Sequence, residues 1–126
     1  MSILKRIFSL KSEKNRLLKE IFQIKLMIPG SFKEVYRKCG KKNCWCQDDT
    51  TSGHPYRRIT WSENGQVKTK AIPEEDINWI KEVTQNYRDF RNKRSDYTKL
   101  GNRVKKLIDE YAKDIIQNTR KLRKYL

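Results

Sequence analysis

All three cysteines and the only histidine of the chain lie within sixteen residues, in the order Cys39, Cys44, Cys46 and His54. Three thiolates and one imidazole complete the tetrahedral ligand set of a structural zinc ion. Because no coordination position is left for a substrate, the pattern C-x4-C-x-C-x7-H predicts a structural zinc site at these four residues. Nearby lysines favour the thiolate forms and offset the charge of −1 that the site would carry; they are Lys38, Lys41 and Lys42.

The same residues allow three other interpretations. Reduced cysteines beside an unrelated histidine would need no metal, and a disulfide with one free thiol would suit an oxidising compartment. A thiol enzyme could pair Cys44 or Cys46 with His54. The odd cysteine count argues against the disulfide. The chain also has no Gly-rich phosphate loop, paired acid cluster or serine-based elbow, so we expect no enzyme.

Basic residues dominate the composition: 30 Lys and Arg stand against 15 Asp and Glu, a net charge of +15. An excess of this size suits a polyanionic partner, nucleic acid above all. Residues 1–28, 29–72 and 99–126 carry +5, +5 and +6, whereas residues 73–98 carry −1. We therefore expect both ends and the middle to face phosphate, and the neutral stretch to pack against protein.

Apolar and aromatic residues make up 36% of the 126 residues, and charged residues another 36%. This favours a small core with long amphipathic helices. No segment approaches the roughly 20 apolar residues that span a bilayer, and the first residues do not resemble a signal peptide. We expect a cytoplasmic protein without a membrane partner or a small-molecule substrate.

Hydrophobic periodicity predicts the elements that position the cysteines. Apolar residues at helical spacing predict an amphipathic helix over residues 3–28, ended by Pro29-Gly30. Strand patterns follow at 31–38, 56–61 and 67–72. A second apolar stripe begins at the proline and three carboxylates of residues 73–76 and runs to the end, with a kink or break near residues 99–101.

The predicted fold is therefore α+β, with three regions. An N-terminal amphipathic helix (residues 1–28) precedes a zinc-knuckle β module (29–72) whose three strands form a small antiparallel sheet around the zinc loop. Helices over residues 73–126 complete an antiparallel helical hairpin or coiled coil.

The hairpin over residues 56–72 allows two registers. A two-residue loop pairs Trp61 with Lys68, whereas a three-residue loop (63–65) pairs Trp61 with Val67 and gathers the apolar residues on one face. Because burial fixes register, we predict the three-residue loop. The outward face would then be a basic strip, formed by Tyr56, Arg58, Thr60, Lys68 and Lys70.

Five short motifs resemble an uncharacterised prokaryotic family of small proteins, over Gly30 to about Arg91. They are Cys39-Gly40-Lys41, Cys44-Trp45-Cys46, His54-Pro55-Tyr56, Ser62-Glu63-Asn64-Gly65 and Tyr87-Arg88-Asp89-Phe90. The resemblance implies zinc and a mobile-element neighbourhood, and it carries no established activity.

These observations predict a small, zinc-stabilised nucleic-acid-binding protein, an accessory or regulatory factor, with DNA favoured over RNA. Trp45 would stack on a base or cap the zinc site, and Arg120 to Lys124 would form a phosphate clamp or fray. The expected contacts are Lys41, Lys42, Trp45, Arg57, Arg58, Lys68 and Lys70. The alternative is a helical adaptor with a structural zinc site, either a monomer or a homodimer through its helices.

Overall fold

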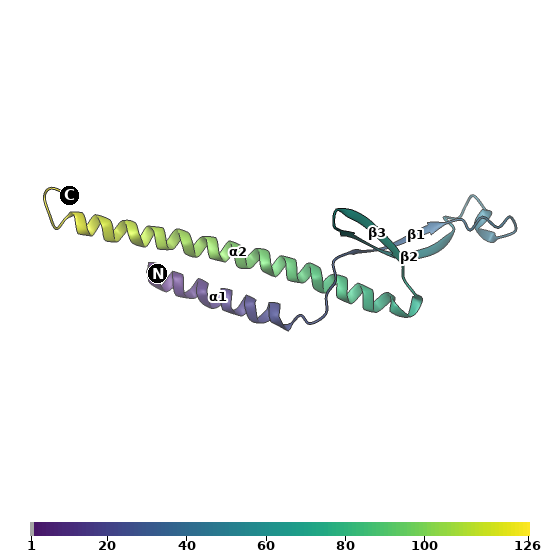
Figure 1. The fold of residues 1–126 in the computed structure, drawn as a ribbon, viewed down its shortest axis with the longest axis horizontal. Coiled ribbons are helices and arrows are strands. Elements are labelled where there is room, and N and C mark those ends of the chain that lie inside the picture. Colours follow the sequence, from purple (N-terminus) through teal and green to yellow (C-terminus); the bar gives the residue numbers. More distant parts are fainter. Residues whose placement is uncertain (1) are drawn as a thin grey trace. The chain divides into compact units, whose positions relative to one another are not determined.

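The computed structural model describes residues 2–126 and confirms the α+β class (Figure 1). Its elements follow the order α1 (Ile3–Gln23), β1 (Ser31–Arg37), η1 (Trp45–Gln47), β2 (His54–Glu63), β3 (Gln66–Ala71), η2 (Glu74–Asp76) and α2 (Ile77–Arg120). The strands form one antiparallel sheet in the order β1-β2-β3. Neither helix in residues 2–126 combines the length and apolar character that crossing a bilayer requires.

The chain forms two compact units. The first, the helical unit, consists of Met1–Lys25 and Phe90–Leu126; the second, the sheet unit, consists of Leu26–Asp89. Helix α2 contributes its first residues to the sheet unit and the remainder to the helical unit.

In the helical unit, α1 lies antiparallel to the later part of α2. Glu20 forms an ion pair with Lys93 (3.1 Å), and the Lys14 ammonium lies 4.8 Å from the centre of the Tyr97 ring. Leucines at helical spacing are buried along these two helices, as amphipathic periodicity predicts; they are Leu10, Leu17 and Leu107.

Helix α1 ends at Gln23, five residues before the predicted end at residue 28. The apolar pattern continues past Gln23, but the backbone leaves the helix at Ile24, which is extended (ψ 112°). The Ile28 N–H donates to the Val83 carbonyl (3.1 Å), and the Asn86 amide donates to the Leu26 carbonyl (2.9 Å). Hydrogen bonds to α2 thus replace those that a longer α1 would have made.

Helix α2 runs unbroken through residues 99–101, so the predicted break is absent. One glycine in a helix interior costs only about 1 kcal/mol relative to alanine, which the packing of a long amphipathic helix outweighs.

The predicted hairpin register is wrong. The loop has two residues, Asn64 and Gly65, with φ of 53° and 79°, and Trp61 pairs with Lys68. Positive φ at both loop residues is the type I′ turn, whose twist matches that of paired strands. Every residue of β3 is exposed, so no buried face opposed the register that the turn favours.

The register also separates the predicted basic strip. Directly paired residues share one face of a sheet, and alternate residues of a strand change face. Lys68 and Lys70 pair with Trp61 and Ile59, so they lie on the face opposite to Tyr56 and Arg58. The prediction of one continuous strip is therefore wrong.

Candidate metal centre

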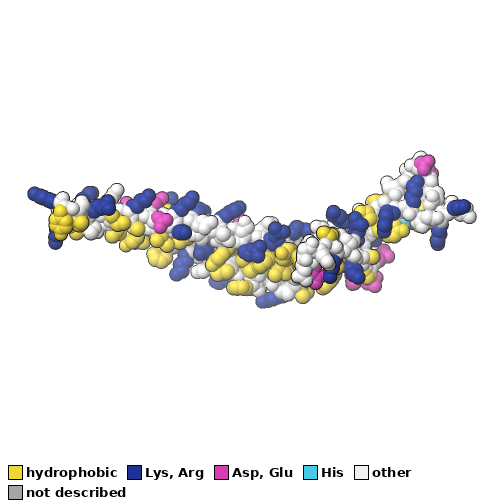
Figure 2. Space-filling model, turned by 45° about the horizontal axis from the view of Figure 1, so that its top comes forward, with side chains coloured by type: hydrophobic (Ala, Val, Ile, Leu, Met, Phe, Trp, Pro, Cys, Tyr) yellow, Lys and Arg dark blue, Asp and Glu magenta, His cyan; other side chains and the backbone are white. Residues whose placement is uncertain are grey.

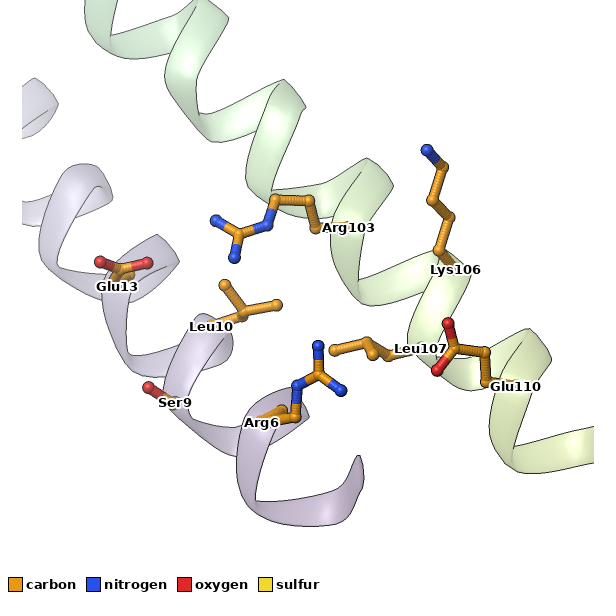
Figure 3. A pocket seen from close by; sticks show the side chains of 8 residues that line it. All are labelled: Arg6, Ser9, Leu10, Glu13, Arg103, Lys106, Leu107 and Glu110. Carbon is orange, nitrogen blue, oxygen red and sulfur yellow. The ribbon is translucent and has the colours of Figure 1, made fainter. Parts of the chain in front are cut away.

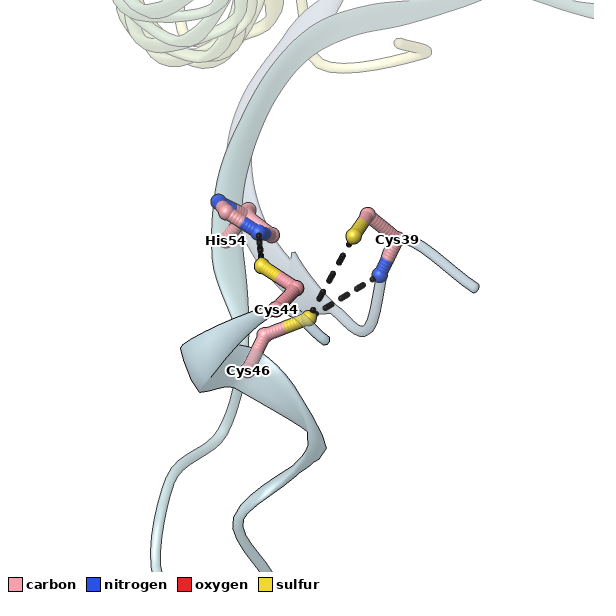
Figure 4. A group of neighbouring side chains, drawn as sticks. All are labelled: Cys39, Cys44, Cys46 and His54. Carbon is pink, nitrogen blue, oxygen red and sulfur yellow. Dashed lines mark hydrogen bonds between the residues drawn. The ribbon is translucent and has the colours of Figure 1, made fainter. Parts of the chain in front are cut away.

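The four predicted ligands come together at the end of the β1–β2 ladder (Figure 4). Their ligand atoms all lie within 4.8 Å of one another. Cys44 Sγ is 3.1 Å from His54 Nε2, and Cys46 Sγ is 3.5 Å from Cys39 Sγ. Cys46 is buried, Cys44 is half-buried and Cys39 is exposed.

Each ligand is placed by a defined element. His54 begins β2 and pairs with Arg37, the last residue of β1, so Cys39 follows just beyond the final pair of the ladder. Cys44 precedes η1, and Cys46 is its middle residue. The backbone N–H of Cys39 donates to Cys46 Sγ (3.3 Å) and so holds the two ends of the loop together.

Gly53 is the functional residue that the sequence analysis missed. Its φ is +103°, and a Cβ built there would lie 2.4 Å from the Arg37 carbonyl oxygen. Only glycine therefore allows the chain to pass this close to β1 immediately before His54. The adjacent Gly53-His54 pair was the available signal, because glycine is the residue that tolerates positive φ and close backbone approach. Gly40, which the metal-site pattern also contains, has φ +82° and open space around it.

The cluster also separates the protonation of its thiols. The backbone N–H of Lys41 and the Cys46 side chain lower the pKa of Cys39 to about 6. At Cys44 the backbone N–H of Cys46 acts to lower the pKa, but partial burial and the Cys46 and Cys39 thiols outweigh it and raise that pKa. One thiolate is thus formed near neutral pH without a metal, while a metal ion would displace the Cys44 proton.

The donor set suits one tetrahedral metal ion. In a thiolate-rich zinc site, Zn–S bonds of about 2.3 Å place neighbouring sulfurs about 3.8 Å apart. The separation of 3.5 Å between the Cys39 and Cys46 sulfurs, with no two ligand atoms more than 4.8 Å apart, needs only small side-chain adjustments to match this. The prediction that these four residues come together is confirmed, and the group they form could hold one metal ion.

Trp45 lies between two ligands and contacts a third. Its ring is 4.7 Å from the His54 ring at an interplanar angle of 57°, yet 58% of the residue remains exposed. Trp45 therefore covers one side of the histidine and still presents an open aromatic face, and its stacking on a base stays a prediction.

The other residues expected to contact nucleic acid lie in four different settings. Lys41 and Lys42 are exposed on the cysteine loop. Arg57 pairs with Glu34 (3.2 Å) and Lys68 with Glu63 (3.2 Å), so these cations are partly neutralised. Two others lie apart: Arg58 has a buried Nε with no hydrogen-bond partner in the described residues, and Lys70 borders an apolar groove.

A family model described as "Domain of unknown function (DUF6788)" matches residues 9–82. The match includes most of α1, the Cys–His cluster and the whole sheet, and it starts earlier in the chain than the resemblance at Gly30. Neither the curated proteins nor the solved structures gave a match to this chain. Because the model covers more than half of the sequence, the chain belongs to the DUF6788 family, a domain of unknown function.

Proposed function

We propose that this protein binds nucleic acid, duplex DNA first, and that the helical unit supplies most of the phosphate contacts. One observation carries the proposal. The helical unit contains 19 Lys and Arg against six Asp and Glu, a net charge of +13, whereas the sheet unit has 11 against nine, or +2. Neutralising phosphates is the largest sequence-independent contribution to DNA affinity, and it requires cations that are free to contact phosphate.

Most cations of the helical unit have no acidic partner. Within the described residues, only Arg16 and Lys93 of this unit form salt bridges, both with Glu20. Figure 2 shows Lys and Arg side chains all along these helices, with few acidic ones between them. They are therefore available to a polyanion without first breaking ion pairs.

A groove of about 480 Å³ between α1 and α2 offers a specific phosphate contact. Arg6 and Arg103 extend their guanidinium groups over the seam where Leu10 and Leu107 meet, and Lys106 borders the same groove (Figure 3). A guanidinium presents a planar fork of donors that matches two phosphate oxygens. Glu13 and Glu110 also line the groove, and they would confine a backbone phosphate to its basic part.

The shape of the charged surface favours DNA over RNA. The major groove of B-form DNA admits an α-helix, whereas that of A-form RNA is too deep and narrow for side chains to read. A basic surface made of two helices suits the former. The accessory role beside a mobile genetic element, which the family resemblance implies, belongs to this proposal and makes duplex DNA the first ligand to test.

We assign the metal centre a structural role with zinc as its ion. Four protein donors leave no open coordination position. The ion would hold the cysteine loop so that Lys41, Lys42 and Trp45 are presented together, and none of these lysines forms a salt bridge in the described residues. This loop would add a smaller second contact, an aromatic face between two cations.

The test is fluorescence anisotropy with labelled duplex DNA over a range of salt concentrations. Replacing Arg6, Arg103 and Lys106 with glutamine should weaken binding and make the slope of log K against log salt shallower by about 2.7, because each lost phosphate contact removes about 0.9. The matched control replaces Lys33, Lys68 and Lys70 of the sheet unit with glutamine, and its slope should change by less than about 1.

Two results would contradict the proposal. Absence of binding at low salt would end nucleic-acid binding altogether. An equal loss of slope in both triple variants would keep binding but refute its assignment to the helical unit.

A further inference from the structure

The last turns of α2 extend past the start of α1. Arg6, in the second turn of α1, lines the same groove as Glu110 of α2. Since the two helices are antiparallel, the first residue of α1 lies close to that level, and α1 offers no cover for the rest of α2. Every residue from 108 to 126 is exposed. We call residues 108–120 the overhang.

The overhang continues the apolar stripe that α1 covers elsewhere. Leu107 is 7% exposed, whereas Ile108, Tyr111 and Ile115 are 50%, 43% and 48% exposed. Steps of three and four residues place these side chains on one face of the helix. A helix with this stripe is stabilised by packing against a second helix, and among residues 2–126 α1 covers the stripe only as far as its own start at Ile3.

Charge is distributed unevenly along the overhang and the residues after it. The first half carries three carboxylates, Asp109, Glu110 and Asp114, against one lysine, Lys113, whereas four basic residues gather at the end. Those cations are Arg120, Lys121, Arg123 and Lys124. Two such segments are complementary when they run in opposite directions and repel each other when they run side by side in the same direction.

We propose that the overhang binds the overhang of a second copy of this chain, antiparallel, about a two-fold axis near Ile115. Ile115 then meets its own counterpart, and Glu110 in the acidic half of each overhang faces Arg120 at the basic end of the other. The partner helix can lie along α2 only beyond the start of α1. The position of that start therefore fixes the register between the two overhangs. A two-fold contact of this kind closes on itself and forms a dimer, not a filament.

The contact is short, which sets its strength. Thirteen helical residues span about 20 Å. Such a pair buries an area at the lower end of specific interfaces, so we expect a dissociation constant in the micromolar range. The proposal does not depend on nucleic-acid binding, since its surface consists of apolar and acidic groups in addition to the cations.

Sedimentation equilibrium of the full-length, metal-loaded protein without DNA tests the contact. Wild-type protein should pass from monomer to dimer over the micromolar range. Ile115→Glu should weaken the dimer at least tenfold, whereas Gln117→Glu, which adds the same charge on the opposite side of the helix, should change it less than threefold. Circular dichroism should show unchanged helix content in both variants. A strict monomer, or equal effects of the two substitutions, would overturn the proposal in favour of a different occupant.

Charge reversal tests the antiparallel direction. Glu110→Lys and Arg120→Glu should each weaken the dimer, because each places like charges opposite one another. The double variant should recover it, because opposite charges then face each other again. Amine cross-linking of a mixture of isotope-labelled and unlabelled protein should join Lys106 of one chain to Lys124 of the other. Links between Lys121 of both chains without any between Lys106 and Lys124, or no recovery in the double variant, would show that the segments are not paired antiparallel.

Discussion

The two units of this chain differ in how they use charge. The helical unit carries +13 and has two cations in salt bridges among its described residues, whereas the sheet unit carries +2 and pairs Lys38, Arg57 and Lys68 with carboxylates. The sheet unit contains a Cys–His group that could hold a metal ion, and the helical unit is built around a leucine seam. The difference teaches that the most chemically recognisable motif of a sequence need not lie where its ligand-binding charge is concentrated. Four experiments can break or sharpen this comparison.

Removal of the metal should have the largest effect, and it should be confined to the sheet unit. Structural zinc sites supply folding free energy to the segment that they close. A chelator should release one metal ion per chain and abolish the hydrogen-exchange protection of the cysteine loop and the adjoining ends of β1 and β2. Amides of residues 90–107 should keep their protection, and affinity for DNA should fall less than threefold. Collapse of protection in both units would show that the comparison is false.

Leu107→Ala should have the converse effect. This leucine is 7% exposed in the seam of the helical unit, so its truncation should cost about 3 kcal/mol through lost burial and a cavity. Ile116, which is 48% exposed on the same helix, provides the control, and Ile116→Ala should cost under about 1 kcal/mol. Urea unfolding followed by circular dichroism measures both. Metal content should remain at one ion per chain, and its loss in Leu107→Ala would indicate coupled units.

Gly53→Ala should damage the metal centre without touching a ligand. The new Cβ would meet the Arg37 carbonyl, and φ +103° is strained for any residue with a side chain. We expect metal affinity to fall about a hundredfold, which corresponds to about 2.7 kcal/mol. Gly40→Ala, at φ +82° in open space, should lose no more than about tenfold. Competition with a chromophoric chelator distinguishes them, and equal losses would mean that strain, not the close approach to Arg37, decides.

Glu34→Gln should have the smallest effect. Hydrogen bonds from the Tyr36 hydroxyl (2.6 Å) and the Arg57 side chain (3.2 Å) lower the pKa of Glu34. A carboxyl whose pKa is lower in the folded than in the unfolded state adds stability above its unfolded pKa and loses it as pH falls through the folded value. The variant should therefore flatten the dependence of stability on pH in the acid range. Thermal unfolding between acid and neutral pH measures this, with Glu75→Gln as the control, and identical slopes would refute the role of Glu34.

Local patterns were sufficient to predict the parts of the fold that depend on local chemistry. The cysteine and histidine spacing identified the group that could hold a metal ion. The alternation of apolar and polar residues predicted the ends of all three strands to within two residues. These features are encoded within short segments, so neighbouring units hardly influence them.

The features that were not predicted depend on distant partners. The end of α1 is decided by two hydrogen bonds with residues of α2 about sixty positions away: the Ile28 N–H donates to Val83, and the Leu26 carbonyl accepts from Asn86. The hairpin register was assigned from burial, but β3 is exposed, so the Asn64-Gly65 turn decided it. The contrast in charge between the units became visible only once α2 was seen to divide at Phe90, because the near-neutral stretch of residues 73–98 belongs to both.

The close passage of Gly53 beside β1 has a consequence for genetics. A random mutagenesis screen for loss of the metal centre would return codons 39, 44, 46 and 54 through altered donors, and codon 53 through the clash and backbone strain that any side chain introduces. Loss at codon 53 would not depend on the chemical type of the new side chain, since alanine, serine and aspartate all introduce the same Cβ. A scan of substitutions at that codon would thus give a flat profile, unlike the graded tolerance expected at the donor positions.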